Sequence, residues 1–208
     1  MQWFCMSLSL QRPARDQELV QIMNTAFADA ARRSGDWLAC RPGCTQCCHG
    51  SFAIHALDVL RLREGVTVLQ QNDPVCAAAM GERARQWIAE HGLDFPGDGQ
   101  TGVLDTSEEA QERFEEFANE AACPALNPVT GLCDVYEWRP MTCRLFGPPV
   151  AMEGGLACCE LCFVDAPEEA LIRSVLEVPH ELEQTLLEPL GIESETVVAY
   201  AITHRGLE

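Results

Sequence analysis

The chain of 208 residues is long enough to bury one sizeable hydrophobic core, and its 47% of apolar residues is typical of a globular protein. Its net charge of −18 opposes binding to nucleic acids and to anionic membrane surfaces, because both partners attract clustered Lys and Arg. We therefore expect no nucleic acid and no membrane among its partners.

The start of the chain does not have the pattern of a signal peptide. Residues 1–10 are apolar but have no basic n-region and no Ala-x-Ala-like cleavage site, and the nearest basic residues, Arg12 and Arg15, come after the apolar stretch. No apolar run approaches the ~20 residues that span a bilayer. We expect a cytoplasmic protein, and in that reducing compartment its 12 cysteines indicate metal ligands or redox thiols rather than disulfides.

A helix is predicted over residues 16–34, because apolar residues recur there at steps of three and four. Asp16 is suited to cap the start of this helix, and Gly35 is suited to stop it. We interpret the segment as a packing helix rather than as a cofactor-binding element.

The next stretch, residues 40–48, is the most informative part of the chain. It carries four thiols within nine residues: Cys40, Cys44, Cys47 and Cys48. Pro42 and Gly43 favour a tight turn between the first two, since proline fixes φ and glycine accepts a positive φ. Such a turn aims several sulfur atoms at one point, as a soft metal ion requires.

Two further helices are predicted in the first half of the chain. One runs from Ala56 to about Glu64, with Gly65 as its end. The other covers residues 74–90, where Pro74 suits the first helical turn.

Residues 94–102 form the clearest loop by composition. After it, residues 106–109 resemble a capping box and predict an acidic helix to about Ala121, with Phe114 and Phe117 on its buried side.

The last third of the chain divides into a loop-rich part and a helical part. Turn residues and cysteines replace helical periodicity over 123–162, whereas the remainder from Pro167 predicts two or three helical segments interrupted by Pro179, Pro189 and Gly191. The fold class we predict is mainly α: a single irregular domain with cysteine-rich loops organised around a metal centre.

Six more cysteines join the first four as candidate metal ligands. The first three of the six are evenly spaced, with nine residues between neighbours, and the last three form a cluster later in the chain. They are Cys123, Cys133, Cys143, Cys158, Cys159 and Cys162. Ten thiols exceed the four of one tetrahedral site. Either two metal sites share the protein, or one polynuclear cluster forms, or some thiols support the ligands or act in redox chemistry.

Two cysteines are left out of the candidate site. Cys76 lies in a predicted helix and is expected to be a small buried hydrophobic residue, while Cys5 lies near the chain end.

Three kinds of site compete for these thiols. Zinc would make a closed structural site that contributes folding energy, and iron would make an iron–sulfur centre. A disulfide framework is the third and is disfavoured in a reducing compartment. Ligand type does not separate zinc from iron, because thiolate suits both.

Several motifs together resemble the YkgJ-type CxxCxxCC family, bacterial proteins described as zinc- or iron-chelating. The shared features are the cysteine cluster at 40–48, the Cys-Pro-x-Leu segment at 123–126, the Cys-x-x-Tyr-x-x-Arg-Pro-x-x-Cys-Arg-x-Phe segment at 133–146, and a late cysteine. Three residues instead of two separate Cys40 from Cys44, and the late cysteine has three candidates. The resemblance covers residues 38–163.

The resemblance implies a chelating domain over 38–163, preceded by a helical extension over 1–37 and followed by helices over 164–208 that pack on the same core. The expected cofactor and partner is zinc or iron. We predict a metal-binding protein whose site is structural or metal-handling. The alternative is an iron–sulfur or iron metalloenzyme with redox or group-transfer activity, since flagellin lysine N-methylases carry a related cysteine pattern.

Residues beside the cysteines have weaker predicted roles. Arg139 and Arg144 would neutralise thiolate charge or donate hydrogen bonds to sulfur, or else pair with carboxylates. Tyr136 is expected to pack against the site. His49 is expected to support the site rather than to bind the metal.

Overall fold

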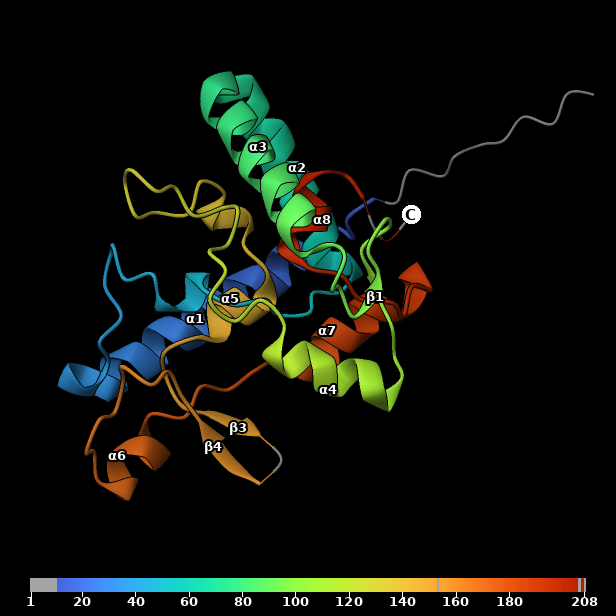
Figure 1. The fold of residues 1–208 in the computed structure, drawn as a ribbon. Coiled ribbons are helices and arrows are strands. Elements are labelled where there is room, and N and C mark those ends of the chain that lie inside the picture. Colours follow the sequence, from blue (N-terminus) through green and yellow to red (C-terminus); the bar gives the residue numbers. More distant parts are fainter. Residues whose placement is uncertain (1–10, 153, 206, 208) are drawn as a thin grey trace, which may run out of the picture.

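The computed structural model describes residues 11–152, 154–205 and 207, and helices dominate them, so the expectation of a mainly α, single-domain fold is confirmed (Figure 1). The α-helices are α1 (Asp16–Ser34), α2 (Ala56–Asn72), α3 (Pro74–His91), α4 (Glu108–Glu116), α5 (Met141–Leu145), α6 (Glu168–Arg173), α7 (His180–Leu187) and α8 (Val198–Ile202). The 3-10 turns are η1 (Gly35–Trp37), η2 (Gln46–Cys48), η3 (Tyr136–Trp138) and η4 (Glu188–Leu190).

The strands form two short antiparallel hairpins. Strand β1 (Gly97–Asp98) pairs with β2 (Val103–Leu104), and β3 (Val150–Met152) pairs with β4 (Gly155–Ala157) in the register Val150↔Ala157. Strand β1 and the turn of the first hairpin lie inside residues 94–102, the segment predicted as a loop, and β2 follows directly after that segment.

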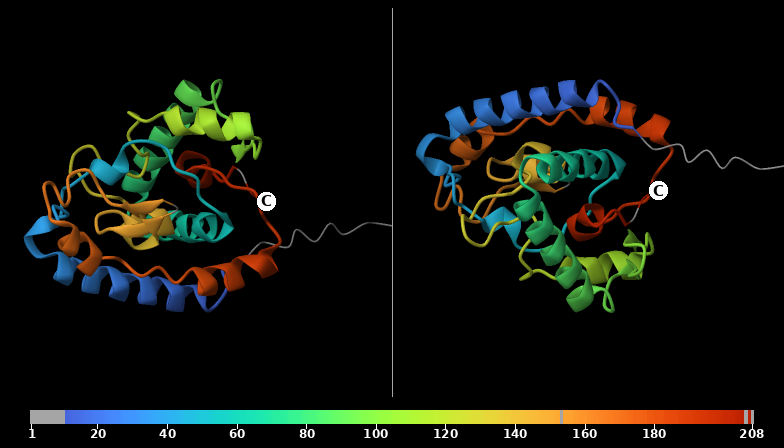
Figure 2. Two further views of the ribbon diagram at one scale, coloured as in Figure 1. Left: turned by 90° about the horizontal axis from the view of Figure 1, so that it is seen from below. Right: turned by 90° about the horizontal axis from the view of Figure 1, so that it is seen from above.

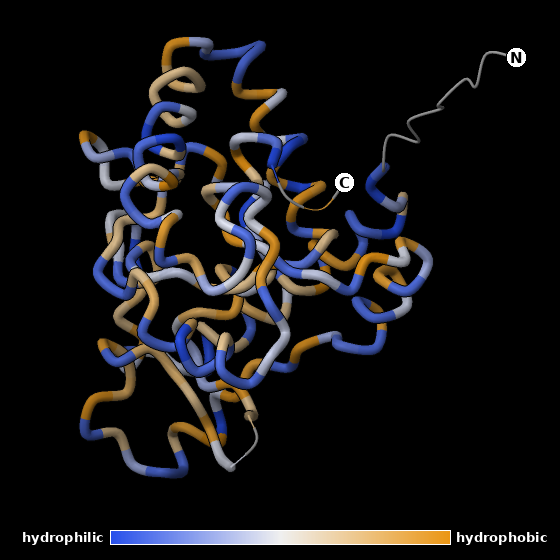
Figure 3. The backbone as a smooth tube through the Cα atoms, turned by 45° about the vertical axis from the view of Figure 1, so that its right-hand side comes forward, coloured by the Kyte–Doolittle hydropathy of each residue, from blue (hydrophilic) through white to orange (hydrophobic). Residues whose placement is uncertain are grey.

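The helices pack in layers around α2. Helices α3 and α8 contact α2 and each other, whereas α1 contacts α5, α6 and α7. Figure 2 shows the long α1 and the segment with α6 and α7 running side by side along one face, with α2 and α8 inside. Hydrophobic and hydrophilic residues alternate along the helices, as expected for helices with one buried face (Figure 3).

Three larger apolar clusters fill the interior of the described residues, and a fourth, small one lies in the loop after β4. The largest joins α2, α3 and α8, a second joins α1 to α7, and the third is aromatic, with Trp87, Phe95, Phe117 and Tyr200. The largest cluster also takes in Cys123 and Cys133 at its edge. The cysteine-bearing loops are therefore attached to the main core.

Helix α1 has the predicted bounds, but Asp16 is not its cap. Arg15 occupies the cap position without a side-chain hydrogen bond, while the carboxylate of Asp16 is buried and accepts hydrogen bonds from Arg61. Gly35 ends the helix with φ = 54°, where a residue without a Cβ is favoured.

The predicted end of α2 at Gly65 is wrong, because the helix continues to Asn72. Gly65 lies against the side chain of Trp138 in η3, and a Cβ at this position would come within 2.7 Å of two Trp138 carbon atoms. The glycine therefore permits close packing of η3 on α2 and does not stop the helix.

Helix α3 begins as predicted, with Pro74 in its first turn and the Asp73 carboxylate accepting the backbone N–H of Cys76. Cys76 is half-buried rather than fully buried. Cys5 lies outside the described residues.

Ser107 caps α4, but this helix ends at Glu116, earlier than predicted. Phe117 takes an extended backbone there and turns into the aromatic cluster, so tertiary packing outweighs the helical pattern.

The segment 123–162 is loop-rich as predicted, and its described residues form only η3, α5 and the second hairpin as regular elements. Helices then return from α6 onward, and Gly191 ends η4 in the left-handed conformation. Within the described part of the chain, no helix is both long and apolar enough to cross a membrane.

Candidate metal centre

The loop that follows α1 is held against the loop that follows β4. The carbonyl of Trp37 accepts the backbone N–H of Phe163 at 2.8 Å, and the side chain of Gln46 donates to the carboxylate of Glu160. Leu38 and Ala39 pack on a small buried cluster made by Cys159, Cys162 and Phe163. In Figure 1 these two loops are the light blue and orange stretches near α1 and α6.

Gly147 fits between these two loops. Its carbonyl accepts the backbone N–H of Cys159, and its Cα lies so close to Cys40 that a Cβ would come within 2.7 Å of the Cys40 Sγ. Its φ of 124° is also one that side chains rarely adopt. Sequence reasoning did not single out this glycine.

A second set of backbone contacts brings residues 48–50 to residues 121–123. The carbonyl of Cys48 accepts the backbone N–H of Cys123 at 2.7 Å, and the backbone N–H of Gly50 donates to the carbonyl of Ala121 at 2.9 Å. Between them, His49 faces Ala122 in an isolated antiparallel bridge. Another such bridge joins Leu126 to Cys133. The Cys48 end of the 40–48 loop therefore contacts the segment that carries Cys123, and this segment pairs in turn with Cys133.

Cys143 is carried to the same place by α5. The backbone N–H of Met141, at the start of this short helix, donates to Asp58 at 2.8 Å and fixes α5 against α2. Burial raises the pKa of the Cys143 thiol well above its usual value, and the neighbouring Cys123 and Cys133 raise it further.

The thiols fall into two groups by the neighbours that affect their ionisation. The outer thiol group is Cys40, Cys44, Cys159 and Cys162. Cys40 is exposed as a whole residue, but partial burial of its thiol raises its pKa to about 12, and its thiol neighbours Cys162, Cys44 and Cys159 add to the effect. Burial also raises the pKa of Cys159, and Cys162 and Cys44 add to it.

The inner thiol group is Cys47, Cys48, Cys123, Cys133 and Cys143. A hydrogen bond from Cys48 lowers the pKa of Cys47 to about 6, and the charge of Arg139 contributes to this shift. The same hydrogen bond raises the pKa of Cys48, and burial raises that of Cys123 to about 12. The inner group therefore contains one thiol poised to ionise among others that are held protonated.

The two arginines of the predicted motif have different roles. Arg139 lies over the Tyr136 ring, 3.8 Å from its centroid, and its charge lowers the pKa of Cys47 and opposes the rise at Cys133. Arg144 is buried and donates to the carbonyls of Glu137 and Arg139 and to the Asn24 side chain, so it orders the turn before α5. Arg139 thus has the charge-neutralising role, and Arg144 a structural one.

Cys158 lies beside the outer thiol group but is linked to just one of its members, Cys162. It is exposed, and its sulfur contacts the carbonyl of Cys162 at 3.9 Å. Burial raises its pKa, and the only thiol that contributes is Cys162.

The donor set fits a soft metal ion, because every member is a cysteine and several are withdrawn from water. Among the described residues, no three side chains of His, Cys, Asp or Glu are placed so that they could hold a metal ion as they stand. The thiols of a group must therefore draw together for an ion to bind.

A family model described as "Putative zinc- or iron-chelating domain", with the short name CxxCxxCC, matches residues 39–163. The chain belongs to this CxxCxxCC family. The match confirms the family predicted from the cysteine segments. No curated protein and no solved structure matches the chain.

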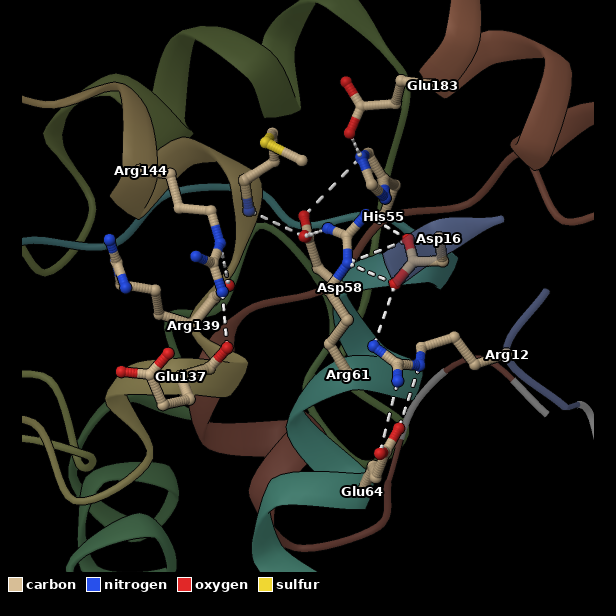
Figure 4. Close-up of polar contacts among 11 residues, drawn as sticks. Arg12, Asp16, His55, Asp58, Arg61, Glu64, Glu137, Arg139, Arg144 and Glu183 are labelled. Carbon is tan, nitrogen blue, oxygen red and sulfur yellow. Dashed lines mark hydrogen bonds and ion pairs between the residues drawn. The ribbon is translucent and has the colours of Figure 1, made fainter. Parts of the chain in front are cut away.

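The CxxCxxCC segment is supported by a buried ion network that sequence reasoning missed (Figure 4). Arg61 is 1% exposed and donates to the carboxylates of Asp16 and Asp58. Asp58 also accepts the backbone N–H of Met141, the first residue of the helix α5 that carries Cys143. His55 lies 2.9 Å from Glu183 of α7. The available signal was a pair of charges, Asp58 and Arg61, inside an otherwise apolar stretch of helix.

Proposed function

We propose that this chain binds zinc or iron through cysteine thiolates and that the bound metal is structural or is handled as cargo. One observation carries the proposal: nine thiols from three separate parts of the CxxCxxCC segment gather around the 40–48 loop. The family description, zinc- or iron-chelating, supports the same class of ligand.

The chemistry of the site supports a metal rather than free thiols. Crowded thiols resist ionisation together, and burial holds Cys123 and Cys143 protonated in the metal-free protein. A cation removes this cost, because it compensates the thiolate charges while Arg139 offsets part of the remainder. When bound, the metal would supply folding energy by joining loops that have little apolar core of their own.

The proposed partner is the metal ion itself, and the proposed compartment is the cytoplasm. A reducing environment keeps the 11 described cysteines available as thiolates, and all of them are free in the structure. The acidic surface supports a metal partner rather than a nucleic acid or an anionic membrane.

The test is elemental analysis of protein purified without oxygen and without metal-binding tags. We expect zinc or iron in stoichiometric amount, and a lower metal content together with lower thermal stability when Cys133 and Cys143 are both replaced by serine. Full metal content and unchanged stability in that double variant would contradict the proposal.

A second candidate function is that of a metalloenzyme, favoured by a hollow that opens beside Cys123. Its walls are apolar and aromatic, with Phe52, Trp87 and Val198 among them, and its volume of about 20 Å³ gives a water-sized molecule access to Cys123 of the inner thiol group. An iron–sulfur centre would supply redox or group-transfer chemistry there. Coloured protein that contains iron and sulfide favours this candidate, and colourless protein that contains zinc favours the first.

A further inference from the structure

We propose that Cys40, Cys44, Cys159 and Cys162 form a metal site of their own, of the closed zinc type, separate from the inner thiol group. This inference rests on the proposed metal-binding function and adds the number and composition of the sites. The CxxCxxCC cluster would then be divided: its first two cysteines serve one ion and its last two belong to another site.

The spacing of the four thiols supports a tetrahedral zinc site. Cys40 and Cys44 are separated by three residues, and Cys159 and Cys162 by two, which are spacings of paired zinc-binding turns. A tight turn lies in each pair. The backbone N–H of Cys44 donates to the carbonyl of Arg41 at 2.9 Å, and the backbone N–H of Cys162 donates to the carbonyl of Cys159 at 2.8 Å. Four thiols complete the coordination without any other ligand.

The contacts between the two turns support the same grouping. The backbone bond from Phe163 to Trp37 and the side-chain bond from Gln46 to Glu160 hold the loops together at their ends. Gly147 lies against the Cys40 sulfur and accepts the N–H of Cys159. The four thiols therefore share one narrow region, and their loops are free to close on an ion.

The chain geometry separates this region from the inner group. After Cys44 the backbone turns through η2, where the backbone N–H of Cys48 donates to the carbonyl of Thr45 at 2.8 Å. The carbonyl of Cys48 then accepts the backbone N–H of Cys123. Cys48 is thus directed to the segment before η3, whereas Gln46, two residues after Cys44, reaches Glu160 in the loop after β4. The division lies within four residues of sequence.

The outer group also has a reason to need an ion. Its local apolar cluster has only Cys159, Cys162 and Phe163 as buried members, and two of those are the ligands themselves. A cluster this small buries little apolar surface, so a metal site would provide much of the stability of this part of the fold.

The experiment measures zinc and iron per chain, and the number of thiols that metal protects from a thiol reagent, after anaerobic reconstitution with zinc alone. The full chain is compared with Cys162→Ser, Cys133→Ser and the matched control Cys158→Ser. We expect two ions in the full chain and in the control. Cys162→Ser should lose one ion and the protection of the outer thiols, and Cys133→Ser should lose the other ion.

Loss of both ions from a folded Cys162→Ser protein would overturn the inference, as would a full chain that holds one ion shared by both groups. If Cys162→Ser does not fold by circular dichroism, Gly147→Ala takes its place, since the new methyl group would collide with the Cys40 sulfur. That variant should lose affinity for one ion at least tenfold and keep the other. A full chain that takes up no metal would contradict the proposed function instead, so the two failures are distinguishable.

Discussion

Arg139 is the charged residue that acts most directly on the inner thiol group. The Arg139 guanidinium lies over the Tyr136 ring and donates a hydrogen bond to the backbone carbonyl of Tyr136 at 2.9 Å. The position of the cation is therefore fixed by its own turn and not by the thiols. This fixed charge, with the hydrogen bond from Cys48, explains why Cys47 is the thiol with the lowered pKa.

Replacing Arg139 by Gln should raise the pKa of Cys47 from about 6 toward, but not to, its ordinary value, because the hydrogen bond from Cys48 remains. The measurement is the pH dependence of Cys47 alkylation in metal-free protein, located by mass mapping. Arg41→Gln is the control, since Arg41 is an exposed arginine of the same loop. An unchanged profile in Arg139→Gln would show that its charge does not act on Cys47.

At this scale the sequence predicted which residue type matters but not how its members are grouped. Spacing alone singled out ten thiols, because cysteine turns and metal sites have recognisable sequence patterns. The grouping depends on tertiary contacts such as Cys48 with Cys123 and Trp37 with Phe163, which join positions far apart in the chain. Gly147 was missed for the same reason, since its neighbour Cys40 lies more than a hundred residues away.

At the scale of elements, a buried ion network joins α1, α2 and α7. Arg61 donates to Asp16 at the start of α1 and to Asp58 within α2, and all three side chains are about 1% exposed or less. Asp58 in turn fixes the start of α5, which carries Cys143. The network therefore sets the position of the helix that brings one inner thiol to the site.

Replacing Arg61 by Ala should lower the free energy of unfolding by about 3–5 kcal/mol, because it removes the buried cation that Asp16 and Asp58 share and leaves them Arg12 at 3.2 Å and His55 at 3.6 Å. It should also weaken metal binding by releasing the start of α5. Chemical denaturation checks the first effect and metal titration the second.

Arg15→Ala is the matched control for that measurement. Arg15 pairs with Glu18 on the surface, where water screens the two charges, so this change should leave stability nearly unaltered. Equal destabilisation by the two changes would contradict the role of the buried network.

His55 gives the attachment of α7 a dependence on pH. Burial lowers its pKa, but the hydrogen bond to Glu183 and the charge of Asp58 outweigh this and raise it above 6.5. A raised histidine pKa stabilises the fold fully below about pH 6.5, and this contribution is lost as pH rises through the folded value. The wild-type chain should therefore gain stability relative to His55→Gln as pH falls from about 8 to 6, measured by denaturant melts at each pH. A constant difference across that range would rule out this linkage.

Helix bounds that depend on local sequence could be predicted, whereas bounds that depend on contacts with distant residues could not. The bounds of α1 and the start of α3 follow from local periodicity and from Pro74, so the sequence alone was sufficient. The ends of α2 and α4 were misplaced because contacts at Gly65 and Phe117 decide them, and those contacts are made with distant residues.

At the scale of the whole molecule, the main core and the metal loops are joined by the 40–48 loop. The inner group is attached to the largest apolar cluster, while the outer group rests on a small cluster next to α6. The division of the chain at residues 37 and 163 stays a prediction, although α1 packs against α5, α6 and α7 as flanking helices on a shared core would.

Metal uptake by the whole protein should release protons, because burial keeps Cys123, at a pKa of about 12, and Cys143 protonated until an ion binds. Affinity should therefore fall as pH falls, by about tenfold per pH unit for each proton released. Chelator competition between about pH 6 and pH 8 measures the slope, and calorimetry in buffers of different ionisation enthalpy counts the protons. Affinity independent of pH would mean that the ligands are already ionised.

The position of the 40–48 loop has a consequence for synthesis of the chain. Its four thiols leave the ribosome before any of their partners, since Cys123 lies 75 residues after Cys48 and Cys159 lies 115 residues after Cys44. An ion captured at that stage would bind the four neighbouring thiols together, an arrangement that the two proposed sites would divide. Maturation then requires the nascent chain either to exchange ligands as Cys123 and Cys159 emerge or to remain metal-free until they do.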